Sequence, residues 1–117
     1  MSEVSKDLVA ASSRMMILSI LAGGENYGYQ ILQTVKQLSD GGWIWSDGML
    51  YPVLHKLEKE KLITSRWEGQ ENGRKRKYYQ LTDKGMKSLE KTVEEWKFVD
   101  ATLHKAWGNL TCQPSIS

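Results

Sequence analysis

Residues 46–81 read SDGMLYPVLHKLEKEKLITSRWEGQENGRKRKYYQL and predict a helix that runs into a basic β-hairpin. Leu50, Leu54 and Leu57 fall at helical spacing, so one stripe of the helix can pack on a core while polar and basic side chains face away from it. Ser46 provides a hydroxyl suited to the N-cap position, which places the start of the helix at this residue. The helix therefore combines a buried stripe with an outward polar face.

The second half of the same stretch predicts the hairpin. Two β-prone runs, residues 63–67 and 77–81, flank the turn-rich segment 69–73. Four consecutive cations follow the turn: Arg74, Lys75, Arg76 and Lys77. A helix followed by a cationic hairpin is the layout of a winged helix-turn-helix domain, so we expect a mainly α chain with one β-hairpin, an α+β fold.

Three further helices are expected around this unit. The apolar spacing predicts helices over residues 7–22 and 27–38, and the first is apolar on most of its circumference. Thr82 can cap a longer helix over residues 83–107, and we expect this helix to pair with that of a second copy of the chain. Its dimerisation seam comprises Leu89, Val93, Trp96, Val99, Leu103 and Trp107. The predicted organisation is a winged helix-turn-helix domain over 1–81, a dimerisation helix over 82–108 packed on the first helix, and a disordered tail over 109–117.

Two ordered motifs carry a family resemblance. The first is Ser46-x-Gly48-x-Leu50-Tyr51-Pro52-x-Leu54-x-x-Leu57-Glu58-x-x-x-Leu62-Ile63, and the second is Gly73-Arg74-x-Arg76-Lys77-Tyr78-Tyr79-x-Leu81-Thr82-x-x-Gly85. Together they resemble the signature of PadR-type transcriptional regulators. The short chain, with one long helix after the hairpin, is similar to the multidrug-binding, LmrR-like branch of that family. The resemblance implies a winged-helix regulator that binds DNA.

Composition narrows the other possibilities. The chain of 117 residues is long enough for about one domain, and its net charge of +2 is small, so affinity for nucleic acid must come from the local cluster of cations. The single cysteine, Cys112, excludes an internal disulfide framework and a cysteine-rich zinc site. No apolar run approaches the roughly 20 residues that span a bilayer. We therefore expect a cytoplasmic protein without membrane contact, metal or cofactor.

Residues of the predicted helix and hairpin are candidates for contacts with double-stranded DNA. Tyr51, His55 and Lys56 project beside or opposite the leucine stripe, where they could reach base edges and phosphates. Pro52 has two interpretations: it marks a kinked or late-starting helix, or it makes a compact contact to a sugar or thymine methyl. A solvated charged face is the alternative for the four cations. The candidate DNA-binding set is Tyr29, Ser46, Tyr51, Pro52, His55, Lys56, Arg74, Lys75, Arg76 and Lys77.

Trp96 and Asp100 form a second candidate site. They lie one helical turn apart, so an indole and a carboxylate share one face and suit a planar or cationic guest. A core tryptophan beside a solvated aspartate is the alternative. The family resemblance implies an effector pore at the dimer interface, with Leu8, Ala11, Ser12 and Met15 of the first helix on its wall. Arg14 would bring a cation near this pore.

Catalysis has little support in the sequence. His55 and His104 lie far apart, and the chain has no His-Glu-x-x-His motif and no phosphate-cradling glycine loop. The sequence therefore predicts a homodimeric, DNA-binding transcriptional regulator and not an enzyme, with a small aromatic effector as a further partner. A small-molecule-binding interaction module without direct gene control is the alternative.

Overall fold

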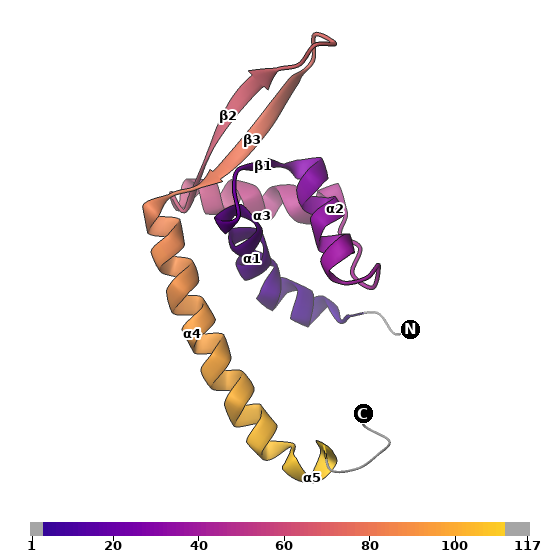
Figure 1. Ribbon diagram of the computed structural model, residues 1–117, viewed down its shortest axis with the longest axis vertical. Coiled ribbons are helices and arrows are strands. Elements are labelled where there is room, and N and C mark those ends of the chain that lie inside the picture. The colour runs from indigo at the N-terminus through magenta and orange to yellow at the C-terminus, as the bar shows by residue number, and fades with distance from the viewer. Residues whose placement is uncertain (1–3, 112–117) are drawn as a thin grey trace.

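A computed structural model describes residues 4–111 of the chain. Its elements follow in the order α1 (Lys6–Ala22), β1 (Asn26–Tyr27), α2 (Gly28–Leu38), α3 (Asp47–Lys59), β2 (Ile63–Gly69), β3 (Lys75–Leu81), α4 (Asp83–Ala106) and α5 (Gly108–Thr111). Helices α1, α2 and α3 form a bundle at the base of the β2–β3 hairpin, and α4 runs away from that base past α1 (Figure 1). The predicted α+β architecture is confirmed.

Hydroxyl side chains define where three of the helices begin. Ser46 accepts a hydrogen bond from the backbone N–H of Met49, so α3 starts where the sequence predicted. Ser5 and Thr82 cap α1 and α4 in the same way. Pro52 lies inside α3, past its first turn, so the late start considered for this helix is wrong.

The sheet contains one strand that the sequence did not predict. Its three antiparallel strands have the order β1-β3-β2, and β1 consists of two residues only, with Tyr27 paired to Tyr78. The predicted hairpin is confirmed but is longer toward its tip, because β2 extends to Gly69 and β3 begins at Lys75. Gly73 makes the turn between them at a φ of 82°, a conformation that favours glycine. We call the hairpin, residues 63–81, the wing.

The core lies between the three N-terminal helices and the base of the wing. The leucine stripe of α3 is fully buried, as predicted, and each such side chain contributes about 1.5–3 kcal/mol to folding through removal of apolar surface from water. Tyr79 of β3 reaches into the same core and is 1 % exposed. The buried apolar residues are Ile17, Leu18, Leu21, Ile31, Val35, Trp45, Leu50, Leu54, Leu57, Leu62, Ile63, Tyr79 and Leu89.

Helix α4 is covered over its first turns only. Leu89 is buried and Val93 packs against the core, whereas every residue from Glu94 to Trp107 is exposed. Large apolar side chains are among them, with Val99 46 % and Trp107 40 % exposed. The outer half of α4 therefore projects from the body of the chain (Figure 1).

The chain continues past α4 as the short helix α5. The sequence predicted a disordered tail from residue 109; the structure places residues 109–111 in α5, and residues 112–117, including Cys112, lie outside the described part. No helix within residues 4–111 is long and apolar enough to cross a bilayer.

Candidate nucleic-acid interface

A groove of about 420 Å³ separates the wing from the start of α2 and from α3. Six of the ten candidate DNA-binding residues line it: Tyr29, Tyr51, Arg74, Lys75, Arg76 and Lys77. The remaining lining residues are Tyr27, Gly28, Trp67, Gln70, Asn72 and Tyr79. We call this feature the basic groove, because four consecutive cations of the wing meet aromatic side chains of the helices in it.

The other four candidates lie outside the groove. Ser46 is the exposed N-cap of α3, and its hydroxyl is already hydrogen-bonded to the helix. Pro52, His55 and Lys56 are exposed on α3. The structure thus separates the candidates into a groove-lining group and a group on the outer surface of α3.

The four wing cations differ in their surroundings. The guanidinium of Arg76 lies 4.0 Å from the centre of the Tyr27 ring, and its hydrogen bond with Tyr78 raises the pKa of Arg76. Lys77 lies on the other face of β3, where its Nζ is 5.7 Å from the Trp67 ring centre. Strand alternation therefore places Arg76 and Lys77 on opposite faces of β3. Arg74 and Lys75, nearer the tip, are exposed to solvent.

The electrostatics of the groove walls favour an anion. Tyr27, the N-cap residue of α2, makes no side-chain cap, and α2 has no acidic residue in its first turn, so the positive end of the helix dipole adds to the field of the cations. Burial raises the pKa of Tyr79 to about 12, with smaller effects from Tyr51 and Glu58. A tyrosine is uncharged at neutral pH even at its ordinary pKa of 10.0, so Tyr79 adds no negative charge to the wall.

Two carboxylates of the helical body hold the wing. Glu58 of α3 accepts a hydrogen bond from Ser65 at 2.5 Å and lies 3.9 Å from Lys77. Glu25, which precedes β1, contacts Arg66 on the other face of the hairpin. Sequence reasoning did not single out these contacts, because the partners are up to 41 residues apart and have no local pattern in common.

The candidate effector residues are only partly brought together. Trp96 is 37 % exposed and borders a small cavity of about 170 Å³ with Thr92, Glu95 and Val99. Asp100 pairs with His104 at 3.3 Å. Among the described residues, those lining this cavity all belong to α4, so Leu8, Ala11, Ser12 and Met15 of α1 do not reach it within one chain.

The α1 residues have contacts of their own. Leu8 is 56 % exposed, Ala11 is exposed and Met15 packs against the core. The hydroxyl of Ser12 donates a hydrogen bond to the carbonyl of Leu8. Arg14 donates two hydrogen bonds to Glu60 at the end of α3, so its guanidinium is already paired within the chain.

The described residues contain no candidate metal site. Within residues 4–111, no three His, Cys, Asp or Glu side chains cluster as a metal ion would require.

A three-helix bundle with a cationic β-hairpin after its third helix defines a winged helix-turn-helix protein. Residues 17–91 match the family described as Transcriptional regulator PadR-like family. The chain belongs to this family, whose members are transcriptional regulators and not enzymes. The predicted family is thus confirmed, whereas the LmrR-like branch stays a prediction.

Individual relatives agree with this assignment. The negative transcriptional regulator PadR of Bacillus subtilis is 37 % identical over 73 residues, which are 62 % of this chain and 40 % of that protein. The transcriptional regulator YqjI of Escherichia coli is 33 % identical over 87 residues, or 74 % of this chain and again 40 % of the relative. This chain thus spans well under half the length of both proteins.

Solved structures match over almost their whole length. A transcriptional regulator from Clostridium thermocellum has a TM-score of 0.78 at 30 % identity, covering 86 % of this chain and 97 % of its own. A PadR-like transcriptional regulator from Bacillus cereus has a TM-score of 0.75 at 32 % identity, covering 86 % and 96 %. The long α4 is part of the similarity, because these matches extend beyond the wing.

Proposed function

We propose that the chain is a homodimeric transcriptional repressor that places α3 in the major groove of its operator and the wing on the flanking backbone. The basic groove carries this proposal. In a DNA duplex, the strand that separates the major from the minor groove would pass between the inserted α3 and the wing. The basic groove of the protein lies at this position, and four cations line it.

The two groups of candidate residues then have different tasks. Arg74, Lys75, Arg76 and Lys77 neutralise phosphates and fix the register of the protein on the duplex, a role that carries no sequence information. Base edges are read from the exposed side of α3 by Tyr51, Pro52, His55 and Lys56. Tyr29, at the start of α2, and Ser46, at the start of α3, contact the sugar-phosphate backbone of the DNA.

The outer half of α4 supports the dimer. Its exposed apolar side chains need a partner, and a second α4 offers the same stripe in return: Trp96, Val99, Leu103 and Trp107. Leu89 and Val93, the first two residues of the predicted seam, already pack in the core of the same chain. The exposed N-terminal part of α1 adds further apolar surface at Leu8 and Ala11. A two-fold protein binds a pseudo-palindromic operator, because each subunit reads one half-site.

An aromatic effector fits at the dimer interface beside Trp96. Its cavity in one chain is small and apolar, and a second chain supplies the opposite wall, as in the LmrR-like branch. Such a ligand changes DNA affinity only if it binds one arrangement of the two subunits better than the other. The same cavity is what favours the second candidate function, an interaction module that binds small molecules without direct control of a gene.

Substitution of the two wing arginines tests the DNA-binding role. We expect Arg74→Ala with Arg76→Ala to weaken operator binding and to lower the slope of log affinity against log salt by about two, one for each lost phosphate contact. Lys91→Ala with Lys97→Ala on α4 removes the same charge away from the groove and is the control. Unchanged binding by the arginine variant would refute the proposal, and transcription from an operator-bearing template in vitro distinguishes repression from activation.

A further inference from the structure

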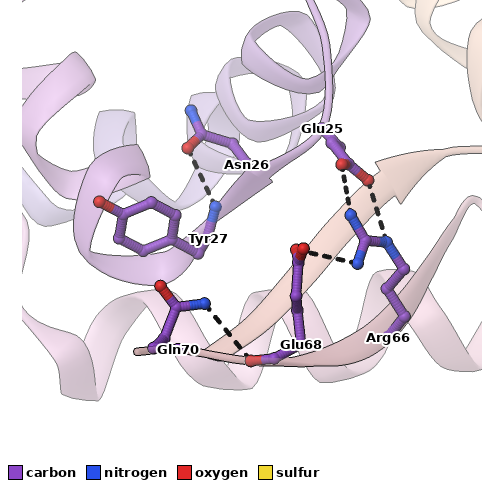
Figure 2. Close-up of polar contacts among 6 residues, drawn as sticks. All are labelled: Glu25, Asn26, Tyr27, Arg66, Glu68 and Gln70. Atoms are coloured by element: carbon purple, nitrogen blue, oxygen red, sulfur yellow. Dashed lines mark hydrogen bonds and ion pairs between the residues drawn. The ribbon is translucent and has the colours of Figure 1, made fainter. Parts of the chain in front are cut away.

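The wing is held from its outer face by a cluster of three charged residues (Figure 2). Arg66 of β2 donates to both carboxylate oxygens of Glu25, with Nη2–Oε1 at 2.5 Å and Nε–Oε2 at 3.3 Å. Its third nitrogen, Nη1, donates to Glu68 at 3.0 Å. The guanidinium also lies 5.1 Å from the centre of the Tyr78 ring. We call Glu25, Arg66 and Glu68 the clamp.

The clamp joins the wing to the helical body. Glu25 belongs to the segment between α1 and β1, whereas Arg66 and Glu68 belong to β2. On the inner face, Glu58 of α3 holds the wing through Ser65 and Lys77. The hairpin is thus held on both faces by a carboxylate of the body, and Arg76 stacks on Tyr27 as a further contact. The tip of the hairpin projects past the helices (Figure 1).

The charges of the clamp are unexpected beside a site for a polyanion. Its two carboxylates and one guanidinium carry a net negative charge, and the hydrogen bonds from Arg66 to Glu25 and Glu68 raise the pKa of Arg66 and keep it ionised. Exposed ion pairs add little to global stability. A two-point contact with a planar guanidinium does, however, fix the direction between the groups that it joins. A positional role therefore explains the clamp better than a stabilising one.

We propose that Glu25 is a wing-positioning residue, which acts through Arg66 to hold the hairpin at the angle that closes the basic groove on a DNA strand. The inference rests on the proposed DNA-binding function. A carboxylate near DNA ordinarily weakens binding by repulsion, whereas Glu25 strengthens it, because the wing is already ordered before DNA arrives.

The direction in which DNA affinity changes when the charge of Glu25 is removed distinguishes repulsion from positioning. Glu25→Gln removes a negative charge, so repulsion alone predicts tighter binding, whereas positioning predicts binding weaker by about three- to tenfold. Glu71→Gln in the wing turn is the matched control, and it binds DNA as well as the unchanged protein or better. Tighter binding by Glu25→Gln would overturn the proposal.

Arg66→Gln provides an independent measurement. If Arg66 positions the wing, affinity falls while the slope against salt stays the same, because no phosphate contact is lost. If Arg66 itself contacts phosphate, the slope falls by about one, which would contradict the proposal. Exchanging the charges, Glu25→Arg with Arg66→Glu, should recover part of the affinity lost by either single substitution, and failure to do so also counts against it.

Hydrogen exchange of the free protein tests the clamp without DNA. We expect the wing amides of residues 67–77 to exchange faster in Glu25→Gln and Arg66→Gln than in the unchanged protein, and at the same rate in Glu71→Gln. Equal exchange rates in all four proteins would show that Glu25 and Arg66 do not hold the wing, even if DNA binding is established. Absence of DNA binding by the unchanged protein would instead refute the proposed function, while the exchange data still decide whether the clamp holds the wing.

Discussion

The hydroxyl of Tyr51 fills the space in which a side chain at Gly28 would lie. A Cβ built on Gly28 would be 2.3 Å from that oxygen and 2.9 Å from the ring carbon that bears it. Gly28 is the first residue of α2, and Tyr51 belongs to the first half of α3. The absence of a side chain at residue 28 therefore lets Tyr51 lie against the start of α2, at the wall of the basic groove.

Gly28→Ala should displace Tyr51 without unfolding the protein. The obstructed atoms are the far end of a side chain, which can swing away, so we expect the free energy of unfolding to change by less than about 1 kcal/mol. Operator affinity should fall about tenfold if Tyr51 makes a base or backbone contact. Gly48→Ala in α3, where the nearest atom is 3.8 Å away, is the control. Urea unfolding and DNA titration check both, and unaltered affinity of Gly28→Ala would remove Tyr51 from the interface.

Gly85→Ala, unlike Gly28→Ala, should lower the stability of the protein. A Cβ at Gly85 would be 2.0 Å from the carbonyl oxygen of Leu62, a backbone atom that cannot swing aside. The start of α4 would have to shift away from the segment between α3 and β2, which costs about 1–3 kcal/mol. Gly69→Ala, with no atom within 4 Å, should leave the midpoint of thermal unfolding nearly unchanged. Equal midpoints of thermal unfolding for the two variants would show that the contact between Gly85 and Leu62 can relax without cost.

The pair formed by Arg14 and Glu60 predicts a pH dependence. The hydrogen bonds from Arg14 lower the pKa of Glu60 below its ordinary value of 4.5. A carboxyl with a lower pKa in the folded chain contributes stability above 4.5, and that stability is lost as the pH falls through the folded value. The effect is small, because more than a third of each side chain is exposed.

Arg14→Met should therefore destabilise the protein at neutral pH, and the difference from the unchanged protein should narrow as the pH falls below 4.5. Urea unfolding at a series of pH values measures the difference. A difference that is independent of pH would mean that the packing of the Arg14 stem, and not its charge, is responsible.

A charge in the α4 seam should dissociate the dimer. Val99 is 46 % exposed within the chain, so Val99→Lys leaves the fold of the monomer intact while it places an ammonium group in the proposed interface. Ala101→Lys adds the same charge on the other side of the helix and should remain dimeric. Sedimentation equilibrium distinguishes the two, and a dimeric Val99→Lys would move the interface elsewhere.

The fluorescence of Trp96 should change when an aromatic ligand binds beside it. We expect acridine, a planar aromatic probe, to quench tryptophan emission of the unchanged protein and of Trp67→Phe, and not of Trp96→Ala. Persistent quenching in Trp96→Ala would assign the binding site to another tryptophan. Chemical conversion of an added aromatic compound would contradict the regulator function altogether.

The sequence predicts those parts of this fold whose signals are local. Ser46, the leucine stripe and the turn at Gly73 each act within a few residues, so α3 and the wing follow from them. Strand β1 could not be predicted, because its two residues become a strand only through pairing with Tyr78 and Tyr79 of β3. Local propensity carries no information about such a partner.

The candidate site follows the same division. The cations of the wing are visible as a run in the sequence, but the contact of Glu25 with Arg66 spans 41 residues and has no sequence pattern. The space that Gly28 leaves for Tyr51 likewise depends on how α2 packs on α3. The apolar stripe of α4 is also visible in the sequence, whereas the surface that covers it cannot be read from one chain.

The salt dependence of DNA binding decides whether this chain is a DNA-binding regulator. Fluorescence anisotropy would follow a labelled duplex from upstream of the protein's own gene, with unrelated competitor DNA present. We expect tight binding that survives the competitor and weakens steeply with salt, because several phosphates are neutralised at once. Weak binding that the competitor abolishes for every upstream fragment would contradict it.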